Sequence, residues 1–174
     1  MPMSHSHISS RLGFALAALA CALLLAFGFY LQYGKGLEPC PLCLVQRGFF
    51  FGVLAVSALA ALQGPGPVGT RVYSIPFFLL AAGGAAVAGR QVWLQHLPKD
   101  RVPACGPDLF FMLENFPLAQ ALKKLVAGTG ECAAVDWTFL GLSIAEWSLA
   151  WFCALALYSV WLAARSTASS PARA

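Results

Sequence analysis

The chain has 174 residues and a formal net charge of +4, and 59% of its residues are hydrophobic while only 10% are charged. Soluble proteins carry roughly 25% charged residues, so this composition predicts an integral membrane protein rather than several soluble domains. The basic residues are spread along the chain instead of forming a patch, which argues against nucleic acid as a partner.

The first apolar run covers residues 12–31 and follows a polar segment, residues 1–10, that we expect to be flexible. As a helix this run is about 30 Å long, which is enough to cross a bilayer. A cleaved signal peptide has a shorter apolar region of roughly 7–15 residues. A lipoprotein would turn polar after its cysteine, whereas this run continues past Cys21. We therefore expect a membrane helix that is retained.

Two further apolar runs cover residues 44–62 and 72–89. Between them, residues 63–71 contain glycines and prolines, which end the second helix because neither residue propagates a helix well. Pro76 is expected in the first turns of the third helix, where its missing amide donor costs least. Glycines and alanines at residues 83–89 give this helix a small-residue face, which allows close packing in a membrane.

The last apolar run of span length covers residues 144–164 and follows a polar connection over residues 90–143. Within this connection, residues 108–124 predict a short amphipathic helix. Two lysines at its end suit the negative pole of a helix dipole. The four long runs together predict an all-α membrane protein, a four-transmembrane-helix bundle that forms a single domain over residues 1–174.

The six cysteines divide between spans and connections. Cys21 and Cys153 lie within apolar runs, and we expect them to pack there because buried cysteine behaves as a small hydrophobe. Four spans leave three connections, and the first and third, residues 32–43 and 90–143, must lie on the same side of the membrane. That side carries the other four cysteines, which are Cys40, Cys43, Cys105 and Cys132.

Lysine and arginine residues occur on both predicted faces, and by charge alone the positive-inside rule mildly favours a cytoplasmic cysteine side. A functional site can also claim basic residues, so the rule does not decide the orientation. Exposed cysteine pairs are typical of an oxidising compartment. We therefore predict that residues 32–43 and 90–143 face such a compartment.

The pair Cys40 and Cys43 indicates redox or metal chemistry, because two intervening residues let both sulfurs face one point. Cys43 lies near the start of the second helix, and Arg47 follows four residues later on the same face. A helix N-terminus and a nearby cation both favour thiolate, the reactive form. Arg47 has a second interpretation, an anchor whose charge reaches the lipid headgroups. Arg90, which ends the third run, has the same two interpretations.

Cys105 and Cys132 are far apart in one connection. A disulfide between them would close a long loop and is compatible with a structural role. Pro103 and Pro107 flank Cys105, and exposed disulfides in such segments tend to be redox-labile.

In combination these motifs resemble the disulfide bond formation protein B (DsbB) family, bacterial inner-membrane quinone reductases that reoxidise the periplasmic oxidant DsbA. Cys40 to Cys43 with Gln46-Arg47 resembles the redox motif of the family's first loop, and Gly89-Arg90-Gln91 resembles another family position. Cys105 and Cys132 match the second redox pair. The segment Trp137 to Ser143, followed by Glu146-Trp147, resembles the entry into the last helix.

The resemblance implies cytoplasmic termini, a cytoplasmic loop over residues 63–71, and two periplasmic loops that carry the cysteines. It further implies a Cys40–Cys43 disulfide beside a bound ubiquinone or menaquinone, and a Cys105–Cys132 disulfide that meets a DsbA-like partner.

Within that scheme, Arg47 matches the family arginine associated with the quinone, and Arg90 is a second quinone-binding candidate. His96 receives no role, because the spacing around it does not align clearly. Reduced DsbA would attack at Cys105, and Cys132 would then attack Cys40 and release a Cys43 thiolate that passes electrons to the quinone.

Two other classes of function compete with this interpretation. The first is a structural zinc site with four cysteine ligands, although zinc sites usually show two short-spaced pairs and only Cys40 and Cys43 are so spaced. We therefore expect no metal. The second is a non-enzymatic membrane adaptor with structural disulfides. Metal analysis tests the first alternative, and a quinone-reduction assay with reduced DsbA tests the second.

Overall fold

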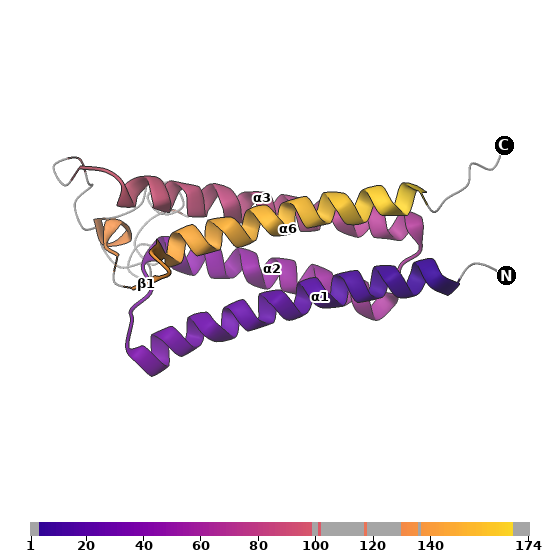
Figure 1. The fold of residues 1–174 in the computed structure, drawn as a ribbon, viewed down its shortest axis with the longest axis horizontal. Helices are drawn as coiled ribbons and strands as arrows, with labels where there is room; N and C mark the ends of the chain where they lie inside the picture. Colours follow the sequence, from indigo (N-terminus) through magenta and orange to yellow (C-terminus); the bar gives the residue numbers. More distant parts are fainter. Residues whose placement is uncertain (1–3, 99–100, 102–116, 118–129, 136, 169–174) are drawn as a thin grey trace.

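A computed structural model describes residues 4–98, 101, 117, 130–135 and 137–168. Within this part of the chain, the long helices are α1 (Ser4–Phe29), α2 (Pro41–Gln63), α3 (Pro67–Gln95) and α6 (Ile144–Ala168). They lie side by side along the long axis, and the start of α1 and the end of α6 are at the same end of the bundle (Figure 1). The predicted all-α, four-helix architecture is confirmed.

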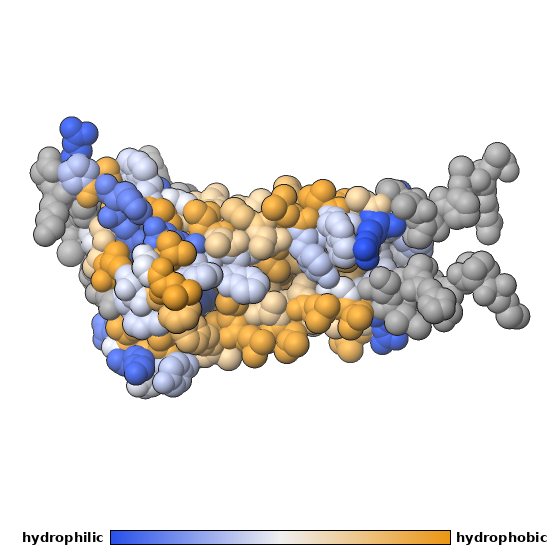
Figure 2. Space-filling view, viewed as in Figure 1, coloured by the Kyte–Doolittle hydropathy of each residue, from blue (hydrophilic) through white to orange (hydrophobic). Residues whose placement is uncertain are grey.

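Each long helix contains a segment that is apolar and long enough to cross a membrane. These segments are Ser10–Gly34, Pro41–Gln63, Pro67–Gln95 and Ile144–Ser166. Their outward faces carry exposed leucines such as Leu23, Leu79 and Leu157. Figure 2 shows apolar residues along the middle of one face and hydrophilic residues gathered toward its ends. Because water would solvate such a surface poorly, lipid is its natural surrounding.

Capping residues explain where α2 begins and ends. Cys40 is the N-cap of α2, and Pro41 takes the first helical position, where a missing amide donor costs little. At the other end Gly64 adopts a left-handed conformation with φ 60°, which favours glycine. Gly66 then caps α3, which begins directly at Pro67.

Two local expectations are wrong. Pro76 lies inside α3 rather than in its first turns, because the helix begins at Pro67, well before the apolar run. The polar segment before the first span is not wholly flexible, since α1 begins at Ser4. A π-helical turn, Tyr30–Gly34, extends α1 at its other end.

A small motif leads into α6. It consists of a 3-10 helix, η3 (Gly130–Ala133), and a hairpin of β1 (Thr138–Phe139) and β2 (Leu142–Ser143). Ser143 and Glu146 then form a capping box, because the Glu146 amide donates to Ser143 Oγ over 3.3 Å and the Ser143 amide donates to Glu146 Oε2 over 2.7 Å. The predicted amphipathic helix, residues 108–124, lies outside the described residues except Pro117.

The small-residue face of α3 packs closely against its neighbours, as predicted, and the groups that it meets are aromatic rings. A Cβ atom added at Gly84 would lie 2.3 Å from the Phe152 ring of α6, so only glycine allows this approach. Phe152 in turn stacks on Phe50 of α2, with ring centroids 4.0 Å apart. This contact joins three helices in the middle of the core.

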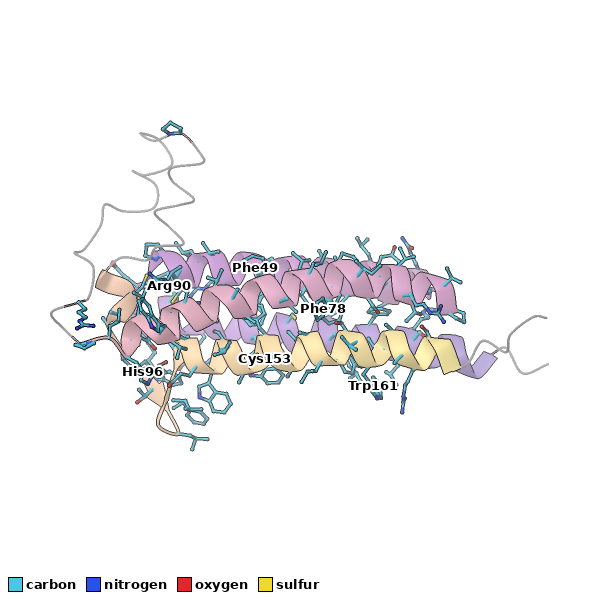
Figure 3. The ribbon with its side chains drawn as sticks, turned by 90° about the horizontal axis from the view of Figure 1, so that it is seen from above. Phe49, Phe78, Arg90, His96, Cys153 and Trp161 are labelled. Atoms are coloured by element: carbon cyan, nitrogen blue, oxygen red, sulfur yellow. The ribbon has the colours of Figure 1, made fainter. Side chains whose placement is uncertain are left out.

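The cysteines of the spans differ in environment. Cys21 is fully buried in the core, as expected. Cys153 is exposed on α6, so the expectation that it packs inside the bundle is wrong for this residue (Figure 3). A cysteine in an apolar run can face either the core or the lipid, and hydropathy does not distinguish the two.

Candidate redox site

Three of the four predicted redox cysteines lie together at the end of the bundle where α2 begins and α3 ends. Cys40 caps α2, and Cys43 occupies its first turn. Cys132 comes from η3, much later in the chain. The parity argument from the sequence therefore agrees with the positions of these three residues. Cys105 lies outside the described residues.

Cys40 and Cys43 form a hydrogen-bonded thiol pair. The Cys40 thiol donates to Cys43 Sγ over 3.1 Å, and the Cys43 amide donates to Cys40 Sγ over 3.4 Å. Cys40 Sγ thus acts as the N-cap acceptor of α2, a role that serine or aspartate more often fills. The helix start therefore holds both sulfurs within reach of each other.

Cys132 is fully buried in a small cluster with Leu42 of α2 and Leu94 of α3, and Cys40 packs against this cluster. Hydrogen bonds from Cys40 to the side chains of Cys132 and Cys43, together with burial, raise the pKa of the Cys40 thiol above its usual range. The cysteine of the third connection is thus in direct contact with the first cysteine pair.

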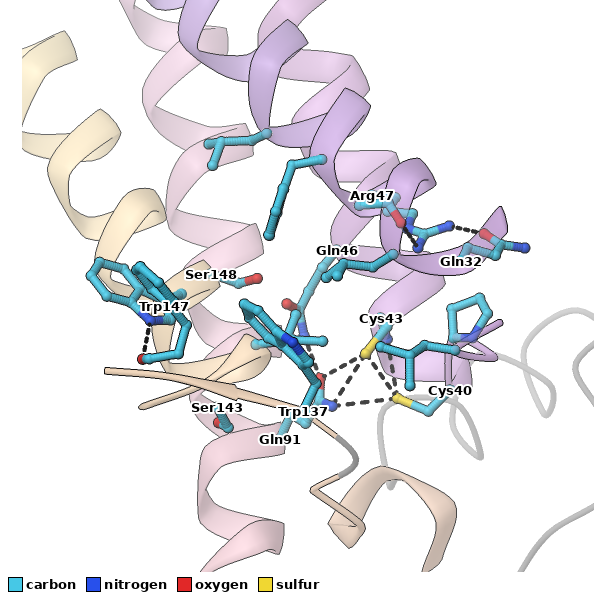
Figure 4. Close-up of a pocket in the computed structure, with 18 of the residues that line it drawn as sticks. Gln32, Cys40, Cys43, Gln46, Arg47, Gln91, Trp137, Ser143, Trp147 and Ser148 are labelled. Carbon is cyan, nitrogen blue, oxygen red and sulfur yellow. Dashed lines mark hydrogen bonds between the residues drawn. The ribbon is translucent and has the colours of Figure 1, made fainter. Parts of the chain in front are cut away.

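Two buried glutamines complete the surroundings of the sulfurs. Gln91 on α3 and Gln46 on α2 are each 3% exposed. Gln46 Nε2 donates to Gln91 Oε1 over 2.7 Å, and Gln91 Nε2 lies 3.3 Å from Cys43 Sγ and 3.4 Å from Cys40 Sγ. Figure 4 shows this connection as dashed lines from Gln46 through Gln91 to both sulfurs.

A cavity of about 520 Å³ adjoins the cysteine pair. Both cysteines line it, together with residues of α1, α2, α3, the hairpin and α6. Aromatic side chains form part of the wall, namely Phe27, Phe50, Trp137, Phe139, Trp147 and Trp151. The wall is mostly apolar with polar side chains at intervals, which is the usual composition of a small-molecule site.

Arg47 lines the same cavity, but its guanidinium is held by α1. It donates to the side-chain oxygen of Gln32 and, over 3.0 Å, to the backbone oxygen of Gly28. It also lies over the Phe29 ring, 5.1 Å from the centroid. Arg47 therefore presents a fixed positive charge on the cavity wall near Cys43 (Figure 4).

Arg90 and His96 lie apart from the cavity. Neither is among the residues that line it, although both lie toward the cysteine end of α3 (Figure 3). The Arg90 guanidinium covers the Trp93 ring at 4.2 Å from the centroid. His96 Nδ1 is 2.9 Å from the Val92 backbone oxygen, and its Nε2 is 4.0 Å from Glu146 Oε1.

Sequence reasoning gives Gln46 and Gln91 no role, although both belong to the motifs that resemble the family. The available signal is one amide inside an apolar run, at Gln46, and a second directly after another run, at Gln91. Such groups need hydrogen-bond partners in a membrane, and they often mark functional sites. Within the described residues, no group of three or more His, Cys, Asp and Glu side chains is arranged to hold a metal ion.

Residues 10–162 match the family described as disulfide bond formation protein DsbB. The chain belongs to the DsbB family. Relatives named disulfide bond formation protein B are 49% identical over 152 residues in Methylococcus capsulatus and 51% identical over 154 residues in Hahella chejuensis. These alignments cover 87% and 88% of this chain, and 93% and 92% of the two relatives.

A third relative of the same name, from Azoarcus sp., is 51% identical over 142 residues. The resemblance stated from the motifs is thereby confirmed. As a member of the DsbB family with four candidate spans, the chain is a multi-pass inner-membrane protein and a quinone-dependent thiol oxidoreductase that serves disulfide bond formation by oxidising DsbA.

Proposed function

We propose that electrons from a DsbA-like dithiol pass first through Cys105 and Cys132, and then through Cys40 and Cys43, to a membrane quinone. The observation that carries this route is the contact between Cys132 and Cys40, which are hydrogen-bonded and share one buried cluster. Thiol–disulfide exchange requires direct contact between the attacking and the attacked sulfur.

The same contact supports the direction of the exchange. Cys132 is hydrogen-bonded to Cys40, the cysteine at the helix cap. Attack by the Cys132 thiolate on Cys40 forms one S–S bond and breaks the Cys40–Cys43 bond, so the electron pair leaves on Cys43. Cys43 is in the first turn of α2, where the positive pole of the helix favours the departing thiolate.

The first step involves the partner protein. Reduced DsbA-like protein attacks Cys105, which frees Cys132 for the second exchange. This assignment rests on the match of Cys105 to the family's second pair and on family membership.

The cavity suits a quinone ring. Its volume of about 520 Å³ is in the range of small-molecule sites, and its aromatic walls fit a flat ring. When bound, a quinone supplies the capacity to accept two electrons. We propose ubiquinone or menaquinone as this acceptor, held beside Cys43 by the wall that carries Arg47. The assignment of Arg90 as a second quinone-binding residue remains a prediction, and its position over Trp93 favours a structural role.

The test is a quinone-reduction assay on purified protein, with a reduced DsbA-like protein as donor and soluble analogues of each quinone as acceptors. We expect turnover that is lost when any one of Cys40, Cys43, Cys105 and Cys132 is replaced by Ala. The matched control is Cys153→Ala, because Cys153 is exposed on α6 and does not line the cavity. Turnover at the parent rate in the Cys132→Ala variant would contradict the proposed route.

A further inference from the structure

The Gln91 amide is oriented by its two sets of neighbours. A primary amide carries one acceptor oxygen and one donor NH₂ group. Gln46 donates to the oxygen over 2.7 Å, so the NH₂ group is the end that faces the sulfurs, at 3.3 Å from Cys43 Sγ and 3.4 Å from Cys40 Sγ. Cys43 Sγ is also 3.6 Å from the amide oxygen, which makes that contact the weaker one.

Burial keeps the Gln91 amide in this orientation. Both glutamines are 3% exposed, so water does not compete for their hydrogen bonds. Turning the Gln91 amide over would set its NH₂ group against the NH₂ group of Gln46 and remove the 2.7 Å bond. A buried donor left without a partner is destabilising, because it has lost its bonds to water and gained none in return.

The Arg47 side chain, a cation on the cavity wall, is already engaged. The Arg47 guanidinium donates to Gly28 of α1 and to Gln32 of the π-helical turn that extends α1. Among the described side chains, the Cys40 thiol and the Gln91 amide donate hydrogen bonds to Cys43 Sγ. In a Cys40–Cys43 disulfide the Cys40 thiol has no hydrogen to give, so Gln91 is the remaining donor of the two.

We propose that Gln91 donates a hydrogen bond to the Cys43 sulfur as that sulfur becomes a thiolate, and that Gln46 is a positioning residue which keeps Gln91 in the donating orientation. The inference rests on the proposed route and adds a group that stabilises its leaving atom. In the step concerned, the Cys132–Cys40 bond forms, the Cys40–Cys43 bond breaks, and Cys43 retains the electron pair.

A neutral amide can stabilise the Cys43 thiolate as it forms. Hydrogen bonds to an ionised acceptor are shorter and stronger than those to a neutral one, so the contact strengthens as charge develops on sulfur. A donor that is already in place requires no reorganisation during the step. Gln91 touches a reacting atom and is thus a catalytic residue, whereas Gln46 acts only through Gln91.

The experiment measures Cys43 alone, without quinone or DsbA. In a Cys40→Ala background, the rate of alkylation of Cys43 by iodoacetamide is followed across pH by mass spectrometry. Gln91→Leu and Gln91→Met keep the size of the side chain and remove the donor. Both should slow alkylation at neutral pH by about tenfold, because they remove a hydrogen bond to a charged acceptor. Both should also move the pH profile to more alkaline values.

Gln95→Leu is the matched control, since Gln95 is one turn further along α3 and its Oε1 accepts from Ser143 rather than contacting sulfur. Its Cys43 pH profile should equal that of the background protein. Gln46→Leu should slow alkylation less than Gln91→Leu, and the double variant should be no slower than Gln91→Leu alone. Such non-additivity identifies a residue that acts through its neighbour.

An unchanged Cys43 pH profile in both Gln91 variants, with thermal unfolding like that of the background protein, would overturn the inference. Failure of the proposed function looks different. It would abolish quinone reduction in the parent protein and leave the alkylation results as they are, because alkylation uses neither partner nor quinone.

Discussion

The Cys132 side chain is hydrogen-bonded to Cys40, although the two cysteines are far apart in the sequence and belong to different connections. Leu42 and Leu94 enclose the Cys132 side chain, and Cys40 packs against that cluster. The contact therefore depends on the apolar packing of η3 between the start of α2 and the end of α3. The protonation of the Cys40 thiol therefore depends on Cys132, which belongs to the other loop.

This dependence predicts how Cys40 reacts in the reduced protein. A raised pKa keeps the Cys40 thiol protonated at pH values near 8.5, where an ordinary cysteine is about half ionised. Since thiolate is the reactive form, we expect Cys40 to be alkylated more slowly than an unperturbed cysteine at this pH. Peptide mapping after timed alkylation with iodoacetamide measures the rate.

Replacing Cys132 by Ala removes the largest cause of the shift. The Cys40 alkylation profile should therefore move toward lower pH in Cys132→Ala. The Cys40 thiol proton also determines how the stability of the reduced protein changes with pH. Because the folded protein holds it more tightly, the reduced protein should lose stability as pH rises above about 8.5, and less so in the variant. Identical Cys40 profiles in parent and variant would argue against the contact.

Arg47 provides a test of the cavity. Arg47 lines the cavity beside Cys43, where its charge can attract the Cys43 thiolate and negative charge that develops on a quinone. At about 4 Å, with an effective dielectric constant near 20, such a charge pair is worth about 4 kcal/mol before desolvation. A quarter of that value corresponds to about a fivefold change in affinity. We expect Arg47→Ala to raise the apparent KM for quinone by about this factor, as measured by steady-state quinone reduction.

Arg47→Lys should be less damaging, because it keeps the charge. It cannot replace both bonds of the guanidinium, which reach the Gln32 side chain and the Gly28 backbone oxygen through different nitrogens. Exchange between DsbA and the Cys105–Cys132 pair should proceed normally in both variants, since that step does not use the cavity. Unchanged quinone kinetics in Arg47→Ala would make Arg47 only an anchor between α1 and α2.

Gly84 offers a test of the packing that holds the bundle together. A Cβ at this position would lie 2.3 Å from the Phe152 ring, and that ring is stacked on Phe50 and has little room to move. Gly84→Ala should therefore destabilise the protein by about 1–3 kcal/mol, the usual cost of overpacking. Gly89→Ala is the control, because among the described residues its Cβ would meet Leu149 alone, at an ordinary contact distance of 3.9 Å. Thermal unfolding in detergent compares the two, and equal midpoints would contradict the tight contact.

The orientation in the membrane is also open to experiment. Lys35 and Arg71 are exposed basic residues at opposite ends of the bundle. In a background without native cysteines, Lys35→Cys should react with a membrane-impermeant thiol reagent in intact cells. Arg71→Cys should react only after lysis. The reverse pattern would place the redox cysteines in the cytoplasm.

Much of the architecture could be predicted from the sequence, because a bilayer leaves few choices. Apolar runs of span length must become helices, since every backbone polar group needs a partner in lipid. Span parity then assigns Cys40, Cys43 and Cys132 to one end without any knowledge of packing, and the structure agrees. That reasoning fails where a helix extends beyond its most apolar residues. Pro76 lies within α3, because helix α3 continues from Pro67 through less apolar residues that hydropathy leaves out.

Hydropathy predicts the four spans, span parity predicts one common end for Cys40, Cys43 and Cys132, and the motifs predict the family. Which groups meet depends on the tertiary structure. The direction of the Gln91 amide depends on its bond to Gln46 across two helices, and the exposure of Cys153 depends on the rotation of α6 about its axis. The physical reason is that hydrogen-bond partners and helix rotation follow from side-chain packing between helices, which no pattern within a single helix records.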